Sequence, residues 1–161
     1  MITQSILALN LNYDPFTGLF IWNRQLGRVK KGDLAGTVNS NGYVQIRIRG
    51  KIYLAHRLAW LYVHGEFPNT MLDHINMDKK DNRIANLRLA TKSQNSQNTL
   101  KSASNTSGYK GVSWYDRSKK WRASIKLNQK FKHLGLFESK EDAHEAYKKA
   151  AKELHTCNNC N

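Results

Sequence analysis

The sequence predicts an α+β protein built from small antiparallel sheets and short helices. Residues 43–49 alternate strictly between apolar and polar side chains, which is the period of a half-buried strand. Three stretches rich in aromatic and β-branched residues, 109–115, 121–127 and 131–137, are separated by short polar loops and predict a three-stranded antiparallel sheet. Residues 139–154 place small apolar side chains on one helical face, so this helix can pack closely against that sheet.

The N-terminal half predicts a helix, two β-hairpins and a second helix. Residues 3–11 suit a short helix, and residues 13–22 form two short apolar runs around a turn that contains Asp, Pro and Gly. Asn41-Gly42 is a turn signal before the alternating strand, which places Arg47 and Arg49 on its polar side. From 55 to 64 the apolar period becomes helical, and Gly65 is a C-terminal stop.

The middle of the chain predicts a strand, a polar loop, a second strand and a helix. Residues 71–75 and 87–90 are the short apolar strands. Thr91 and Gln94 have the spacing of a capping box, so a helix is expected to start at Thr91 and to carry Asn95 in its first or second turn.

The composition requires a polyanionic partner. The 161 residues contain 26 Lys and Arg against 12 Asp and Glu, a formal charge of +14, and a hydrophobic fraction of 40% allows a folded core. Residues 109–137 carry eight cations and one acid, whereas 138–155 are almost neutral. No apolar run is long enough for a membrane span and no signal peptide is visible, so we expect a cytoplasmic protein that binds nucleic acid.

The domain limits follow from composition. Residues 99–108 are small and polar, as in a linker. We therefore expect a first domain at 1–98 with its functional core at about 70–98, a linker at 99–107, a second domain at 108–156 and a tail at 157–161.

The ordered set Asp73-His74, Asn82, Asn86-Leu87-Arg88 and Asn95 resembles the HNH nuclease family, which has the ββα-metal fold. Its spacings of twelve residues from His74 to Asn86 and nine from Asn86 to Asn95 match the motif. Within that family the sequence is similar to the branch found in phage and intron homing endonucleases, and residues 56–60 and 13–22 also resemble segments that precede the motif there.

The resemblance implies the role of each residue. By position, His74 is the general base, Asp73 and Asn95 are ligands of one divalent metal, and Asn86 pins the loop and orients His74. A neutral imidazole can accept a proton from water at pH 7, and a hard cation stabilises the charge that develops during phosphodiester hydrolysis. One carboxylate and one amide favour Mg²⁺ or Mn²⁺ and disfavour zinc. Asn82 and His56 are assigned as structural residues near the site from the residues themselves. For His56 three roles stay open: packing beside the site, contact with DNA, or a satisfied structural histidine.

Residues 107–155 look like the DNA-binding domain of the plant APETALA/ethylene-response factors. The resemblance implies that the sheet lies in the major groove, with cations and aromatics on its exposed face. Cations and aromatics also interleave along the strands of this sequence. The expected DNA contacts in the whole chain are Arg47, Arg49, Arg57, Arg88, Lys110, Trp114, Arg117, Lys119, Trp121, Arg122, Lys126 and Lys132, and alternation requires some of the aromatics to fill the core instead.

The sequence thus predicts a homing-type endonuclease that nicks double-stranded DNA as a monomer with one divalent metal, in the bacterial host cell if a phage encodes it. One alternative is a non-catalytic DNA-binding regulator on an inert HNH scaffold. An RNA-binding protein is a weaker alternative, because no stacking motif of the common RNA modules is present. Cys157 and Cys160 have half a zinc-knuckle spacing, but only His155 lies nearby as a further ligand.

Overall fold

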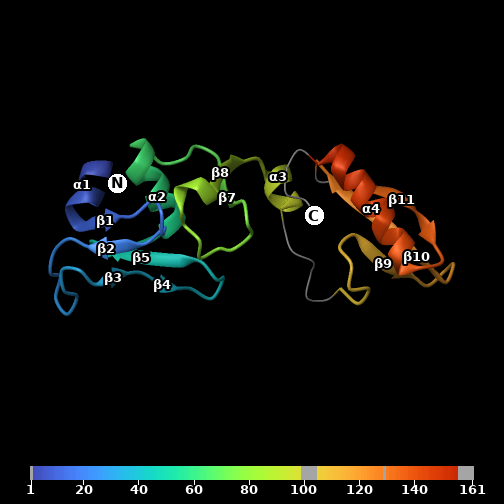
Figure 1. Ribbon diagram of the computed structural model, residues 1–161, viewed down its shortest axis with the longest axis horizontal. Coiled ribbons are helices and arrows are strands. Elements are labelled where there is room, and N and C mark those ends of the chain that lie inside the picture. Colours follow the sequence, from blue (N-terminus) through green and yellow to red (C-terminus); the bar gives the residue numbers. More distant parts are fainter. Residues whose placement is uncertain (1, 99–104, 129, 156–161) are drawn as a thin grey trace. The chain divides into compact units, whose positions relative to one another are not determined.

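The computed structural model describes residues 2–98, 105–128 and 130–155. The chain groups into two compact units, Met1–Ala90 and Thr91–Asn161. Both units contain helices and antiparallel sheets, which confirms the predicted α+β class (Figure 1). Within the described residues, no helix is long and apolar enough to cross a membrane.

The first unit opens with a helix and a β-hairpin. Helix α1 (Gln4–Asn10) begins at Thr3, whose side chain accepts a hydrogen bond from the Ile6 amide. Strand β1 (Leu11–Tyr13) pairs with β2 (Phe20–Trp22), and β2 pairs with the short β3 (Leu34–Ala35). The predicted helix at 3–11 and the predicted hairpin at 13–22 are confirmed.

A second sheet leads directly into a buried helix. Its strands are β4 (Thr37–Val38), β5 (Val44–Ile48) and β6 (Lys51–Leu54), with β5 in the centre. The helix α2 (Ala55–His64) ends at Gly65, which adopts the left-handed conformation with φ 82°. Strand alternation buries one face of β5, and that face joins α1 and α2 in one core whose largest fully buried side chains are Leu7, Leu11, Phe20, Ile46, Ile48 and Leu58.

A two-stranded hairpin completes this unit. Strand β7 (Met71–His74) pairs antiparallel with β8 (Leu87–Ala90), and a short 3₁₀ turn, η1 (Ile84–Asn86), leads into β8. The two predicted strands are therefore present, and the polar segment 75–86 forms the long connection between them.

Gly18 allows the first hairpin to pack against this connection. It has φ +74°, and a Cβ atom at this position would collide with the backbone of Asn82 and Arg83. Glycine adopts this φ readily and has no Cβ atom that could collide. The turn of the β1–β2 hairpin can therefore support the Asn82 backbone directly.

The second unit begins at the capping box. Thr91 and Gln94 form both reciprocal hydrogen bonds, and α3 (Lys92–Gln97) follows them as predicted. Strands β9 (Val112–Tyr115), β10 (Lys120–Leu127) and β11 (Lys130–Phe137) form an antiparallel sheet with β10 in the centre. Helix α4 (Lys140–Leu154), capped by Ser139, packs on this sheet (Figure 1).

Alternation along β10 assigns its residues to two faces. Ala123 and Ile125 are almost fully buried against α4, so Arg122, Ser124 and Lys126 face the other way. The predicted sheet packed on one helix is therefore confirmed, with a helix-side face and an open face.

The division between the units precedes α3, whereas the sequence places a linker at 99–107. Hydrogen bonds join α3 to the sheet of its own unit: Lys110 Nζ donates to the Gln97 carbonyl at 2.7 Å, and the Asn128 amide donates to Ser93 Oγ at 3.3 Å. The predicted domain limits 1–98 and 108–156 remain predictions. The linker lies partly, and the tail 157–161 wholly, outside the described residues.

Candidate active site

Asp73 and His74 occupy the end of β7, where the chain leaves the hairpin for the long connection. The register pairs Asp73 with Arg88 and His74 with Leu87 on β8. Both β7 residues are buried. Because successive residues of a strand point to opposite faces, the carboxylate and the imidazole leave the strand on opposite sides.

The Asp73 carboxylate is paired with a cation. Arg88 donates to one carboxylate oxygen, Oδ2, from Nη2 at 2.8 Å and from Nε at 3.1 Å. The sequence assigned Arg88 to DNA, but its guanidinium lies on this carboxylate and is only about one-quarter exposed. It neutralises a buried acid, which would otherwise carry a large desolvation cost.

Asn86 fastens the connection between the strands. Its Oδ1 accepts from the Asn76 amide at 3.0 Å, and its Nδ2 donates to Asn76 Oδ1 and to the Asp81 carbonyl, both at 2.9 Å. Arg83 hydrogen-bonds the Asp81 carboxylate and lowers its pKa to about 2. These contacts hold Asn86 to the β7–β8 connection, and its loop-pinning role stays a prediction.

His74 is oriented by Asn82. His74 Nε2 lies 3.5 Å from Asn82 Oδ1, and Asn82 Nδ2 donates to the Lys80 carbonyl at 2.9 Å. The Asn82 carbonyl accepts from the Tyr13 hydroxyl at 2.8 Å, and burial raises the pKa of Tyr13 to about 12. Tyr13 and Asn82 therefore connect the first hairpin to the imidazole, a link that sequence reasoning missed.

A second histidine lies against the first. The His56 and His74 rings meet edge to face, with 5.0 Å between centroids, and the Tyr43 ring lies 5.4 Å from His56 and 6.0 Å from His74. His56 is 5% exposed, and within the described residues its buried Nδ1 has no hydrogen-bond partner.

The site keeps both imidazoles neutral. Burial, reinforced by His74 and Arg57, lowers the pKa of His56 to about 3. Burial also lowers the pKa of His74, although Asn82 and the carboxylates of Asp73, Asp81 and Asp78 oppose the shift. A neutral His74 can accept a proton, which is the state that a general base needs.

The metal-ligand prediction joins residues of different units. Asn95 lies on α3 in the second unit, and Asp73 lies on β7 in the first, so their partnership stays a prediction. Among the described residues, no group of three or more His, Cys, Asp or Glu side chains could hold a metal ion. One carboxylate and one amide are not such a group, but both are hard oxygen donors. Cys157 and Cys160 lie outside the described residues.

The predicted DNA contacts of the first unit fall into two kinds. Arg47 and Arg49 are exposed beside the β5–β6 turn, and Arg47 Nη1 reaches the Gly50 carbonyl at 3.4 Å. Arg57 instead donates to the Pro68 carbonyl at 3.3 Å and covers the Phe67 ring at 5.7 Å. The Arg57 side chain therefore makes its contacts within the first unit.

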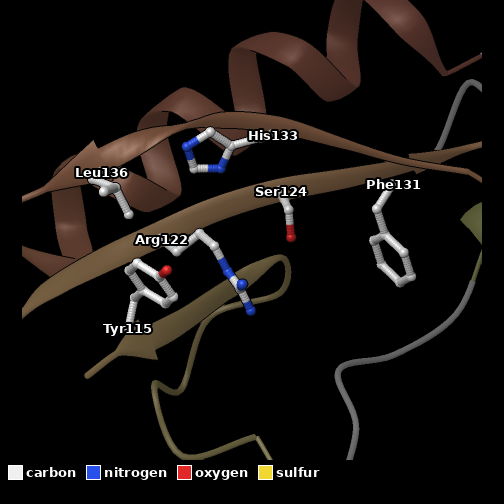
Figure 2. Close-up of a pocket in the computed structure, with 6 residues that line it drawn as sticks. All are labelled: Tyr115, Arg122, Ser124, Phe131, His133 and Leu136. Atoms are coloured by element: carbon white, nitrogen blue, oxygen red, sulfur yellow. The ribbon is translucent and has the colours of Figure 1, made fainter. Parts of the chain in front are cut away.

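The open face of the β9–β11 sheet carries a groove of about 530 Å³. Figure 2 shows its lining side chains on the side of the sheet away from α4, namely Tyr115, Arg122, Ser124, Phe131, His133 and Leu136. Only Arg122 belongs to the predicted DNA contacts. Sequence reasoning missed the other five, although the alternation of apolar Ala123 and Ile125 with polar residues could have identified the opposite face.

The remaining predicted contacts of this unit do not line the groove. Trp114 opposes Trp121 across β9 and β10, on the face of Ala123, and Lys132 opposes Ile125. Trp121 packs against the buried residues there, whereas Trp114 is 41% exposed. Lys126 is exposed on the open face, and Arg117 and Lys119 are exposed in the β9–β10 loop, where Lys119 pairs with Asp116 at 3.3 Å. Lys110 contacts the Gln97 carbonyl.

Comparison with known proteins gives a family match and viral relatives. The model of the HNH endonuclease family matches residues 53–97. Protein 3.8 of Escherichia phage T7 is 37% identical over 71 residues, 44% of this chain and 59% of that protein. The "Uncharacterized HNH endonuclease L560" of Acanthamoeba polyphaga mimivirus is 31% identical over 118 residues, 73% of this chain and 60% of that protein.

The chain thus spans about 60% of the length of these two relatives. A solved structure titled "DNA binding and cleavage by the HNH homing endonuclease I-HmuI" aligns over 84% of this chain and 76% of that one, with 22% identity and a TM-score of 0.42.

Proposed function

We propose that this chain, whose residues 53–97 carry the pattern of the HNH endonuclease family, hydrolyses phosphodiester bonds of double-stranded DNA. The observation that carries the proposal is the surroundings of His74. The imidazole is buried, biased towards its neutral form and oriented by Asn82, and Asp73 precedes it on the same strand.

His74 takes the proton of the attacking water in this proposal. Asn82 Oδ1 is placed to accept the Nε2 proton, which leaves Nδ1 as the basic nitrogen of the neutral ring. Tyr13 holds the Asn82 backbone, and Asn86 holds the connection that carries Asn82. The neutral form of the His74 imidazole supports proton transfer, because a protonated imidazole could not act as the base.

Asp73 and Asn95 would hold one divalent cation, for which Mg²⁺ or Mn²⁺ fits oxygen donors better than zinc. When bound, such an ion stabilises negative charge on the scissile phosphate and the leaving oxygen. Arg88 occupies Asp73 Oδ2 in the structure, so it keeps the buried carboxylate paired before a cation arrives.

The second unit supplies DNA affinity in this proposal. Its open sheet face bears Arg122 and Lys126, and residues 109–137 carry seven more cations than acids. This charge supports binding to nucleic acid, and we propose that the unit is a DNA-binding domain of the APETALA/ethylene-response-factor type. We extend the proposal to a homing-type enzyme of phage origin that nicks DNA as a monomer in the cytoplasm of its bacterial host.

One observation favours a second function, a DNA-binding regulator without catalysis. The Asp73–Arg88 ion pair could remain closed, and the carboxylate would then be unavailable to a metal. Such a protein would bind DNA in every metal condition and cut it in none.

A plasmid-nicking assay distinguishes these functions. The full-length protein is incubated with supercoiled DNA in Mg²⁺ and in EDTA, beside an Asp73→Asn variant that preserves the side-chain shape. We expect nicking only by the unchanged protein in Mg²⁺, with DNA binding retained in EDTA. Nicking in EDTA would contradict the metal mechanism, and binding without nicking in any divalent metal would favour the regulator.

A further inference from the structure

The open face of the C-terminal sheet combines cations with exposed apolar side chains. Three cross-strand pairs of β10 and β11 lie on it, namely Arg122–Leu136, Ser124–His133 and Lys126–Phe131. Directly opposed residues of two strands share one face, so these pairs form three successive rows. Tyr115 on β9 lines the same groove (Figure 2).

Arg122 and Lys126, two of the cations on this face, lie over aromatic rings. The Arg122 guanidinium lies 5.5 Å from the Tyr115 centroid and donates from Nη2 to Ser113 Oγ at 3.2 Å. The Lys126 ammonium lies 5.7 Å from the Phe131 centroid. These contacts place positive charge beside the groove, which suits a polyanion.

Phosphate binding alone does not explain the apolar part of the groove. Phe131 is 75% exposed and Leu136 is 38% exposed, although both flank cations on a strongly charged face. Contact between an exposed phenyl ring and a phosphate does not stabilise the complex. Contact between that ring and an apolar group of the ligand does, because it removes apolar surface from water. The ligand should therefore present acceptors and an apolar group close together.

The major groove of DNA meets this description at thymine. Each thymine displays the O4 acceptor beside a C5 methyl group, and the other unmodified bases display no methyl there. We propose that Phe131 and Leu136 form a contact site for thymine methyl groups, while Arg122 and Ser124 face neighbouring polar base edges or phosphates. The inference rests on the proposed DNA binding of this chain and assigns part of its sequence preference.

Uracil substitution tests the methyl contact directly, because it removes the methyl and keeps every hydrogen-bonding group of the base. Two duplex pools of the same random sequences are made, one with thymine and one with uracil throughout. Binding of the full-length protein to each pool is measured in EDTA, where the proposed cleavage cannot interfere. We expect tighter binding of the thymine pool, by about fourfold for each methyl buried.

Variants locate the contact on the groove. Phe131→Ala combined with Leu136→Ala should abolish the preference for thymine, and the exposure of both side chains limits the effect on folding. Lys126→Gln should weaken binding to both pools alike and retain the preference. Phe16→Ala is the control in the first unit, because Phe16 is 88% exposed and should leave the preference unchanged.

The outcomes separate this inference from the proposed function. Equal binding of both pools by a protein that binds DNA would overturn the thymine contact and leave nuclease activity possible. A preference that survives the double Phe131 and Leu136 substitution would place the contact outside this groove and would also overturn the inference. Failure to bind either pool would contradict the proposed function itself.

Discussion

Arg88 and Asp73 face each other across the β7–β8 hairpin, and the guanidinium donates two hydrogen bonds to one carboxylate oxygen. The arginine therefore occupies the carboxylate to which we assign a metal. A cation at Asp73 and the guanidinium of Arg88 stabilise the same buried charge, so each should reduce the contribution of the other.

Arg88→Met tests this competition, because methionine keeps much of the apolar stem and removes the charge. Without metal, the variant should lose about 3 kcal/mol of stability, since the buried carboxylate no longer lies beside the guanidinium charge. Excess Mg²⁺ should then raise the melting temperature of the variant more than that of the unchanged protein. Thermal unfolding in EDTA and in Mg²⁺ measures both effects, and equal Mg²⁺ shifts would argue against a shared site.

Tyr13→Phe tests the link between the first hairpin and His74. Loss of the hydroxyl leaves the buried Asn82 carbonyl without its donor, which should cost about 1 kcal/mol and lower the rate of cleavage more than DNA affinity. Tyr62→Phe is the matched control. Its ring lies 5.7 Å from that of Tyr13, but its hydroxyl donates to Asn12. Single-turnover rates and affinities that respond equally in both variants would contradict the link.

Gly18→Ala tests the support that the first hairpin gives to the Asn82 backbone. The φ at this position is unfavourable for alanine, and the alanine Cβ would collide with the Asn82 and Arg83 backbone. The variant should therefore lose more than about 1 kcal/mol of stability and most of its activity. Gly27→Ala provides the comparison, because Gly27 also has positive φ but no atom lies within 4 Å of its added Cβ. If denaturant unfolding gives the same loss for both variants, packing at Gly18 is not important.

His56 should make stability depend on pH. Burial lowers the pKa of His56 from 6.5 to about 3 in the folded protein. The stability that the folded protein has while this imidazole is neutral in both states is therefore fully present above pH 6.5 and is lost as the pH falls towards 3. One proton changes stability by at most about 1.4 kcal/mol per pH unit. In His56→Phe the free energy of unfolding should therefore fall less steeply between pH 6.5 and 4 than in the unchanged protein. The remaining pH dependence in this range should come partly from His74. An unchanged slope would show that His56 is not the group responsible.

Local signals predicted most of the elements. The capping residues Thr91 and Ser139, the stop at Gly65 and the alternation within 43–49 act within a few neighbouring residues, so the helices and strands they predict are present. The Asn86 network is also local, because its partners lie within ten residues of it.

Contacts between distant segments could not be predicted in this way. The Asp73–Arg88 pair depends on the register of two strands joined by a long connection, and a one-residue shift would separate these side chains. His56 meets His74 only because α2 and β7 belong to one folded unit. The same limit explains why Tyr115 and His133 were missed, since their shared groove requires the pairing of three strands.

Cleavage by a His74→Ala variant tests the central claim most directly. The unchanged protein, the variant and a His64→Ala control, whose histidine is exposed at the end of α2, are compared on the same duplex in Mg²⁺. We predict that all three bind DNA alike and that only His74→Ala loses cleavage, by at least about a hundredfold in single-turnover rate. Undiminished cleavage by His74→Ala would contradict the assignment of this histidine as the general base.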